Sequence, residues 1–232
     1  MSDKNRVLII GGHTAGIGDA VYKTIRNSDA PVESEIFLPT RDEFNVLGEQ
    51  KMLAYMKANG PFDQIVYSAG VTKLAWIEYI TKISLDKIFE INVTGAILVA
   101  QAHLAAHPGH RVRYAVVVSD ASDTPMRGSV AYCASKAALA MAVRVMAREL
   151  APDWITVAVS PGVVDDTGMT NQLAKDIPEF RNWTPEAARA YEDKGSVLGR
   201  RMTKEEVADA IVFALNGPEG LNGSTVTLNG GK

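Results

Sequence analysis

Short runs of apolar residues alternate with longer amphipathic stretches along the whole 232-residue chain. Continuous apolar runs of four to six residues are typical of parallel strands that helices cover on both faces. We interpret six segments as strands: Arg6–Ile10, Ser34–Leu38, Gln64–Tyr67, Arg113–Val118, Ile155–Val159 and Ser224–Leu228. Amphipathic stretches between them predict helices near Ile17–Asn27, Glu49–Asn59, Ser84–Ala106, Ala131–Leu150 and Lys204–Asn216.

This alternation of strands and helices predicts the fold class. It indicates an α/β protein with a Rossmann-type, doubly wound and mostly parallel sheet that has helices on both faces. No stretch with the composition of a linker divides the chain, so residues 1–232 are expected to form a single domain.

The segment Asp165–Arg201 does not follow the alternation. Glycines and prolines are interspersed there with Met169, Leu173, Phe180 and Trp183. We interpret it as an irregular insertion that closes over a substrate as a lid, because excursions of this length are uncommon without a role. A surface excursion without a role is the alternative. With few regular backbone hydrogen bonds, the segment is expected to be mobile when empty, and Trp183 is expected to contact the substrate.

Composition and charge exclude several classes of partner. A net charge of −3 gives no electrostatic reason to expect nucleic acid or an anionic membrane. No apolar run reaches the length of a membrane span, and no signal peptide is recognisable, so a cytoplasmic protein is expected. The single cysteine, Cys133, excludes an intrachain disulfide, and no metal site is expected. We expect His103, His107 and His110 at the surface near a helix end.

A glycine-rich loop follows the first predicted strand. Residues 7–10 lead directly into Gly11-Gly12-His13-Thr14-Ala15-Gly16-Ile17-Gly18, and a helical pattern begins at once. Glycines let the backbone approach a pyrophosphate, and the helix N-terminus offers unpaired N–H groups to that anion. The loop therefore predicts nucleotide binding, with a tight turn that binds nothing as the alternative.

A second pattern places a phenol beside an ammonium. Tyr132 and Lys136 are four residues apart, so they share one face of the predicted helix. A nearby ammonium stabilises the phenolate, which allows the phenol to transfer a proton near neutral pH. Taken alone, such a pair is usually a solvated helix face.

Together with further motifs, these residues resemble the short-chain dehydrogenase/reductase family, in its short single-domain branch. Gly12-x-x-x-Gly16-Ile17-Gly18 is similar to the cofactor loop of that family, and Ser119 lies 13 residues before Tyr132, where the family has its active-site serine. Three more motifs match: Ser68-Ala69-Gly70, Ile91-Asn92-Val93 and Ser160-Pro161-Gly162. The end of the chain, Leu228-Asn229-Gly230-Gly231, resembles the family's Asp-Gly-Gly. Gly11 and Ser68 stand where the family usually has threonine and asparagine. Thr167 lies one residue later than the threonine that follows the family's Pro-Gly motif.

The resemblance implies an oxidoreductase that interconverts a carbonyl and a secondary alcohol by hydride transfer. It implies catalytic roles for Tyr132 as general acid/base, Lys136, Ser119 on the substrate oxygen, and Asn92 anchoring a water. It also implies a homodimer or homotetramer, formed through helix 131–150 and the helix after Asn92. The expected cofactor contacts are Gly12, His13, Thr14, Gly16, Ile17, Gly18, Arg41, Asn45, Val46, Ser68, Ala69, Gly70, Tyr132, Lys136, Pro161, Gly162, Val163 and Val164.

The second strand bears on the choice of cofactor. Its tip carries no carboxylate for a ribose 2′-hydroxyl, whereas Arg41 suits a 2′-phosphate, so NADP(H) is predicted. Asp42 keeps NAD(H) as the alternative. Two other functions stay open: a catalytically silent dinucleotide-binding sensor or scaffold, and an extended-branch epimerase or dehydratase, for which the chain is short. The substrate is expected to be a small carbonyl compound or alcohol, which the sequence does not identify.

Overall fold

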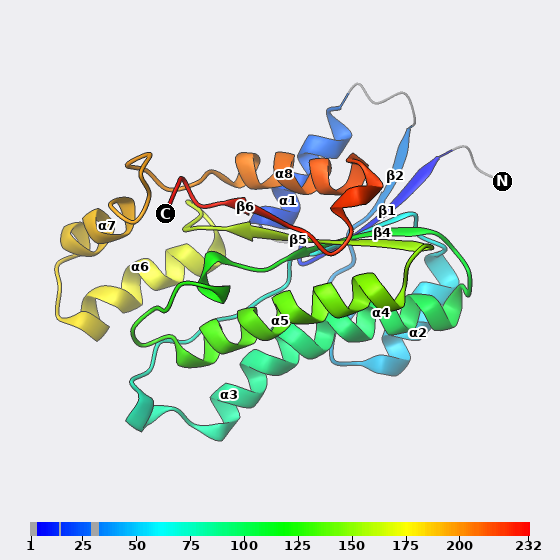
Figure 1. Ribbon diagram of the computed structural model, residues 1–232. Helices are drawn as coiled ribbons and strands as arrows, with labels where there is room; N and C mark the ends of the chain where they lie inside the picture. The colour runs from blue at the N-terminus through cyan, green and yellow to red at the C-terminus, as the bar shows by residue number, and fades with distance from the viewer. Residues whose placement is uncertain (1–3, 14, 29–32) are drawn as a thin grey trace.

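The computed structural model describes residues 4–13, 15–28 and 33–232. Its centre is one six-stranded parallel sheet, in the order β2-β1-β3-β4-β5-β6 (Figure 1). The strands are β1 (Asn5–Ile10), β2 (Ser34–Phe37), β3 (Gln64–Tyr67), β4 (Val112–Val117), β5 (Trp154–Pro161) and β6 (Thr225–Leu228). The fold class predicted from the apolar pattern is confirmed, and the strands agree with the predicted ones to within a residue or two.

Helices cover both faces of the sheet. On one face lie α1 (Ile17–Arg26) and α8 (Lys204–Asn216), and on the other lie α2 (Glu49–Asn59), α4 (Gly95–Ala106) and α5 (Val130–Glu149) (Figure 1). The predicted helix at 84–106 is α3 (Lys82–Phe89), a π-helical turn η2 (Glu90–Thr94) and α4 in succession. Three single turns complete this part: η1 (Ile77–Tyr79), η3 (Asp120–Ser122) and η4 (Glu219–Leu221).

The two-sided cover explains the continuous apolar strands. In β1, Val7 and Ile9 pack into the core with α1 and α8, whereas Leu8 and Ile10 pack into the core with α2 and α4. All four are at most 4% exposed. Because successive side chains of a strand point to opposite faces, a strand buried on both sides needs apolar residues at every position.

The strand order creates the crevice in which a ligand can bind. From β1 the chain moves outward to β2, and it then returns to form β3 on the other side of β1. The connections after β1 and β3 therefore diverge at the carboxyl ends of these strands, which is where open α/β sheets bind ligands. The glycine loop and Ser68-Ala69-Gly70 both lie at this point.

The expectation of an irregular segment at 165–201 is wrong. It contains two helices, α6 (Gly168–Arg181) and α7 (Pro185–Asp193). Thr167 caps α6, since its Oγ1 accepts a hydrogen bond from Thr170 N at 3.1 Å, and Thr170 completes a capping box. Thr184 caps α7, and Pro185 occupies its first turn. These residues are helix start signals, and Gly168 and Pro185 begin their helices, whereas Pro178 lies inside α6.

The expectation of surface histidines is wrong for His103, which is fully buried. Its Nε2 accepts a hydrogen bond from Phe62 N at 3.1 Å, and burial lowers its pKa to about 3, so the ring is neutral. His107 and His110 are half-buried beside it, 2.9 Å from Met56 O and 3.1 Å from Asp63 Oδ1 respectively. The end of α4 packs on the sheet, and the sequence pattern at this helix end does not predict that packing.

Two helical stretches, 82–106 and α5, are long and apolar enough to cross a membrane by length and composition alone. No single apolar run predicts this, because polar residues interrupt both stretches. Helices α4 and α5 cover the sheet, where Val99 of α4 and Leu139 and Val143 of α5 are fully buried. Burial in the protein core accounts for part of the apolar composition, since 44% of the apolar window within each stretch is buried.

Candidate active site

The glycine loop is packed so tightly that larger residues do not fit. A Cβ on Gly12 would lie 2.5 Å from Leu38 Cδ2, and one on Gly18 would lie 2.5 Å from Gly12 Cα. Gly11, which departs from the family pattern, has φ +88° and sits directly against Ala69 N. Glycine is therefore required at these positions for the close packing of the loop, and the start of α1 that follows is a helix N-terminus of the kind that binds a pyrophosphate. Gly16 and Ile17 begin α1, His13 is exposed in the loop, and Thr14 lies outside the described residues.

The loop after β3 joins the glycine loop to the centre of the site. Ser68 Oγ donates a hydrogen bond to Ile10 O at 2.8 Å, which ties the end of β3 to β1. A Cβ on Gly70 would lie 3.5 Å from Asn92 Oδ1 and 3.6 Å from Lys136 Nζ. Gly70 therefore lets the backbone pass beside two of the predicted catalytic groups.

Asn92 lies in the π-helical turn η2 and is fully buried. Its Oδ1 accepts a hydrogen bond from Val71 N at 2.8 Å, and its Nδ2 donates to Val71 O at 3.0 Å and to Ser135 Oγ at 2.9 Å. Ser135 in turn donates to Tyr132 O at 2.7 Å. The side chain thus fixes the loop after β3 against α5, and the π-turn provides the local widening typical of functional positions.

Ser119 comes directly after β4 and caps the single turn η3. Its Oγ accepts a hydrogen bond from Ala121 N at 3.2 Å and donates to Asp120 Oδ1 at 3.4 Å. Ser119 also lies close enough to the phenol of Tyr132 to influence its pKa. The hydroxyl predicted to hold the substrate oxygen therefore lies next to the predicted proton donor.

Tyr132 and Lys136 lie one turn apart near the start of α5, as predicted. Lys136 Nζ is 5.9 Å from the centroid of the Tyr132 ring and donates a hydrogen bond to Val117 O at 2.9 Å. Burial lowers the pKa of Lys136 to about 8, so the ammonium form still predominates at neutral pH. Burial raises the pKa of Tyr132 to about 12, and the nearby Ser119 side chain opposes this rise. The phenol is therefore protonated at neutral pH.

The remaining predicted cofactor contacts lie at the carboxyl edge of the sheet. Asn45 and Val46 lie between β2 and α2, where Asn45 Oδ1 accepts from Leu47 N at 3.0 Å and Val46 packs near Gly95. Pro161 ends β5, and the backbone of residues 162–164 is held by hydrogen bonds to Leu228 and Met202. Thr167 caps α6, so its hydroxyl is engaged there.

Arg41 is exposed in the turn after β2, and within the described part of the chain it forms no ion pair. The nearby Glu43 accepts a hydrogen bond from Thr40 N at 2.8 Å, which holds the pKa of this carboxyl below its usual range. Glu43 is thus used in stabilising the turn, while Asp42 is exposed.

The segment of α6 and α7 lies against the site through an aromatic contact that the sequence did not reveal. Phe180 of α6 stacks on Trp76 of the loop after β3, with ring centroids 4.5 Å apart and an interplanar angle of 22°. A Cβ on Gly128 would meet the Phe180 ring at 2.5 Å. Trp183, in contrast, packs against Tyr191 within the segment. Phe180 rather than Trp183 therefore faces the body of the protein.

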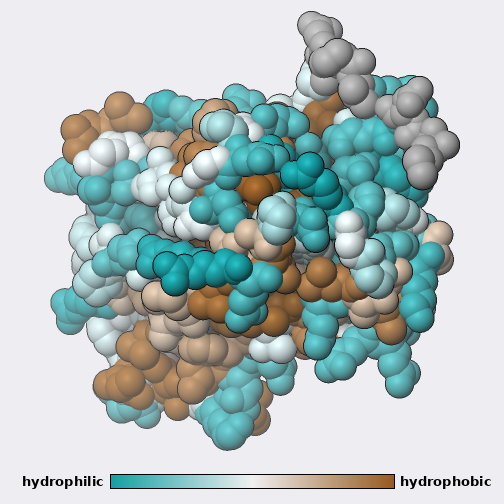
Figure 2. All heavy atoms as spheres, turned by 45° about the vertical axis from the view of Figure 1, so that its right-hand side comes forward, coloured by the Kyte–Doolittle hydropathy of each residue, from teal (hydrophilic) through white to brown (hydrophobic). Residues whose placement is uncertain are grey.

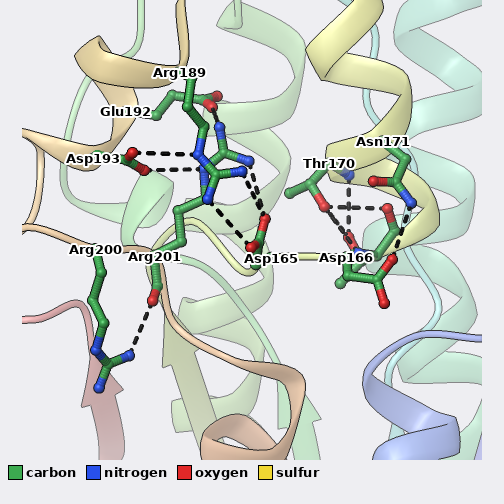
Figure 3. Close-up of polar contacts among 10 residues, drawn as sticks. Asp165, Asp166, Thr170, Asn171, Arg189, Glu192, Asp193, Arg200 and Arg201 are labelled. Atoms are coloured by element: carbon green, nitrogen blue, oxygen red, sulfur yellow. Dashed lines mark hydrogen bonds and ion pairs between the residues drawn. The ribbon is translucent and has the colours of Figure 1, made fainter. Parts of the chain in front are cut away.

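A cluster of ion pairs anchors this segment at its base (Figure 3). Arg201 is 5% exposed and pairs with Glu192 at 2.5 Å and Asp165 at 3.3 Å, while Asp193 Oδ1 lies 3.4 Å from its Nε. Arg189 bridges Asp165 and Asp193 from the solvent side. The cluster joins the residues before α6, the end of α7 and the residues after it. Arg189 and Arg201 therefore have a structural role here.

Sequence reasoning missed one further group beside Ser119. Asp120 is 5% exposed, and its Oδ2 accepts an ion-pair contact from Lys232 Nζ at 2.9 Å. A charged residue directly after the apolar run of β4 was the available signal, since a buried carboxylate needs a partner.

Known proteins resemble this chain in sequence and in fold. A family model described as enoyl-(acyl carrier protein) reductase matches residues 49–232. L-xylulose reductase of Mus musculus is 34% identical over 178 residues, which cover 74% of this chain and 68% of that protein. L-xylulose reductase of Caenorhabditis elegans is 28% identical and covers 97% of this chain and 94% of its own length. Gluconate 5-dehydrogenase from Burkholderia cenocepacia, solved with NADP and tartrate, superposes with a TM-score of 0.84 at 21% identity, over 99% of this chain and 95% of that one.

Proposed function

Because the chain belongs to the short-chain dehydrogenase/reductase family, we propose that Tyr132 exchanges the proton in its reaction, assisted by Lys136, Ser119 and Asn92. The protein is a nicotinamide-dependent oxidoreductase that interconverts a carbonyl and an alcohol. The observation that carries the proposal is the convergence of Ser119, Tyr132 and Lys136, from two separate elements, beside the glycine-lined crevice.

Each side chain has a distinct task in this proposal. The nicotinamide supplies or takes up the hydride. Tyr132 donates its phenol proton to the substrate oxygen, and the Lys136 ammonium stabilises the phenolate that is left. The Ser119 hydroxyl holds the substrate oxygen close to the phenol. The bonds of Asn92 to Val71 and Ser135 support a positioning role, and a water relay from Asn92 to Lys136 stays a prediction.

The substrate is proposed to be a small carbonyl compound, and L-xylulose is the first probe because two relatives are named for its reduction. The test follows NADPH oxidation with a panel of ketones and aldehydes that includes L-xylulose. Turnover that depends on Tyr132 supports the proposal. Cofactor binding without turnover of any compound would favour the silent sensor or scaffold instead. A cytoplasmic location is proposed, with which the single thiol of Cys133 is compatible.

NADP(H) is the proposed cofactor, with Arg41 as the residue that binds the 2′-phosphate. We expect Arg41→Ala to raise the Kd for NADPH by about tenfold or more, because a charge-assisted hydrogen bond contributes about 1.5–3 kcal/mol. The Kd for NADH should not change. Arg26→Ala, which removes another exposed arginine, is the matched control. Fluorescence titration measures both constants, and tighter binding of NADH than of NADPH by the wild type would contradict the assignment.

A homodimer or homotetramer is proposed through α4 and α5, which cover the same face of the sheet (Figure 1). Both helices carry exposed apolar side chains on this surface: Ile97, Met141 and Val145. Figure 2 shows apolar side chains gathered in the lower part of the molecule, at the level where Figure 1 draws α3, and Ile83 of α3 is 82% exposed. Exposed apolar patches of this kind are typical of subunit contacts.

We expect light scattering at micromolar concentration to give two or four times the chain mass of 25.0 kDa. Met141→Glu places a charge in the proposed contact and should lower the mass toward that of one chain. Tyr191→Glu on α7 is the control, since it also places a charge at an exposed apolar position but lies outside α4 and α5. A wild-type mass of about 25 kDa would show that the contact does not form.

The segment 165–201 is proposed to act as a substrate lid made of two helices. Its base is fixed by Arg201, whereas Phe180 and Trp76 are the contact that closing forms and opening breaks. Closing excludes water from the phenol and its neighbours, which strengthens their electrostatic interactions. We expect amide exchange in this segment to slow when NADPH and substrate bind, and Phe180→Ala to raise KM several-fold.

Trp183→Ala is the matched control for the lid, because it removes an aromatic ring that packs inside the segment. We expect it to change KM less than Phe180→Ala does. Hydrogen exchange measured with and without ligands is the decisive experiment. High protection of 165–201 in the free enzyme, unchanged by ligands, would mean that the segment is fixed structure.

A further inference from the structure

The strand β6 is followed by a segment that reaches back to the centre of the site. Lys232 Nζ lies 2.9 Å from Asp120 Oδ2, and Asp120 Oδ1 accepts a hydrogen bond from Ser119 Oγ at 3.4 Å. The backbone on the way is fixed, since Val197 N donates to Gly230 O at 2.9 Å and Gly231 N donates to Asn229 Oδ1 at 3.1 Å. A chain of contacts therefore runs from Lys232 through Asp120 to the hydroxyl that is proposed to hold the substrate oxygen.

Asp120 is a buried carboxylate next to Ser119. Its side chain is only 4% exposed, and a buried carboxylate is costly unless it is paired. The negative charge also opposes formation of a phenolate, and it raises the pKa of Tyr132. An unpaired Asp120 would thus act against the chemistry proposed for its neighbour. The ammonium of Lys232, 29% exposed, supplies the missing positive charge.

We propose that Asp120 and Lys232 form a positioning pair, which orients Ser119 and balances the charge beside Tyr132, so that the segment after β6 is part of the active site. The pair rests on the proposed function, because it acts through Ser119 and Tyr132 and touches neither substrate nor cofactor. Asp120 orients the Ser119 hydroxyl, and the positive charge of Lys232 compensates the negative charge of the carboxylate.

The other charged groups nearby have partners of their own. Asp120 and Lys232 share a small cleft with Glu192, Arg200 and Arg201. Arg201 pairs with Glu192 at 2.5 Å, and Arg200 pairs with Glu206 at 2.6 Å. On the side of α5, the ionisable groups next to the phenol are Cys133 and Lys136. Within the described residues, Lys232 is the cation that contacts Asp120, so replacing it should change the electrostatic potential at Tyr132.

The test is a pH titration of the Tyr132 phenol, which needs no knowledge of the substrate. Protein labelled with ¹³C at the tyrosine Cζ is followed by NMR, and the Tyr132 resonance is the one that Tyr132→Phe removes. Asp120→Asn keeps the shape of the side chain and removes its charge, so we expect the midpoint to fall by about one pH unit. Near pH 12 an ordinary lysine is largely neutral whereas an arginine keeps its charge, so Lys232→Arg should lower the midpoint and Lys232→Met should leave it close to the wild-type value.

Two further variants separate an effect of the pair from a general effect of charge. In the Asp120→Asn background, Lys232→Arg should cause no further shift, because the group that it balances is gone. Lys4→Arg alters another lysine–carboxylate pair of 2.9 Å, with Glu33, in the same way and should leave the midpoint unchanged. A Lys232→Arg midpoint equal to that of the wild type, or an equal shift in both backgrounds, would overturn the proposal.

Kinetics with a turned-over carbonyl compound distinguishes this proposal from the proposed function. At pH 7 the loss of the cation beside Asp120 should lower kcat, so Lys232→Met should be slower than the wild type and Lys232→Arg should not be. If Tyr132→Phe is active, the proposed function itself fails. If Tyr132→Phe is inactive but Lys232→Met has the wild-type kcat and Lys232→Arg the wild-type NMR midpoint, only the positioning pair fails.

Discussion

Replacing Tyr132 with phenylalanine is expected to reduce turnover by about 10²–10⁴-fold, the usual contribution of a positioned general acid. The substitution keeps the ring, which lies half-buried beside Ser119, and removes only the hydroxyl that carries the proton. No other described side chain is placed to replace it: Cys133 points from the same turn as a half-buried thiol, and Lys136 is held by Val117 O. The measurement is kcat for NADPH-dependent reduction.

Cofactor binding separates loss of chemistry from loss of structure in this experiment. The Kd for NADPH should stay close to that of the wild type, because the glycine loop lies on other elements. Tyr79→Phe is the matched control, since it deletes a hydroxyl from a 71% exposed tyrosine. Its kcat should equal that of the wild type. Near-wild-type turnover by Tyr132→Phe would show that another group donates the proton.

Replacing Lys136 with methionine is expected to have two opposite effects. Turnover should fall by at least about 10²-fold, because the phenolate loses the cation that stabilises it. The free energy of unfolding at pH 7 should instead increase, because Lys136 is 3% exposed and burying its charge is costly. A residue that assists catalysis but lowers the stability of the folded protein is a common trade-off at active sites.

The pH dependence of this gain follows from the lowered pKa of Lys136. Burial moves it from 10.5 to about 8, so between these values the unfolded chain binds more protons than the folded protein. The free-energy cost of burying the Lys136 charge is therefore fully present below pH 8 and disappears as the pH rises toward 10.5. Each pKa unit corresponds to about 1.4 kcal/mol, which makes about 3 kcal/mol the upper limit. Loss of the hydrogen bond to Val117 O reduces the gain by about 1 kcal/mol.

Urea unfolding at pH 7 and at pH 10 measures the effect. The difference in unfolding free energy between Lys136→Met and wild type should be clearly positive at pH 7 and smaller at pH 10. Lys57→Met, at an exposed position of α2, is the control and should show no such difference between the two pH values. A variant that is less stable than wild type at pH 7 would mean that the Lys136 charge is well compensated in the folded protein.

The order of elements and the central residues of the site were predictable from the sequence alone. Strands buried on both faces, such as β1, must be apolar at every position, and this pattern is visible without coordinates. The glycine loop follows its strand directly, and Tyr132 and Lys136 are one helical turn apart, so local geometry is sufficient to relate them. Ser119 and Asn92 were found through family spacing, which stands in for the tertiary structure.

The tertiary structure alone decided the relations between distant residues. Lys232 and Asp120 are 112 positions apart, and no local pattern indicates that they form an ion pair. The same holds for Phe180 on Trp76 and for His103, whose burial depends on how the end of α4 packs. The helices of segment 165–201 were within reach of the sequence, through Thr167 and Thr184, but their glycines and prolines concealed them. Local propensity determines where elements begin and end, whereas the pairing of charges and rings depends on chain packing in three dimensions.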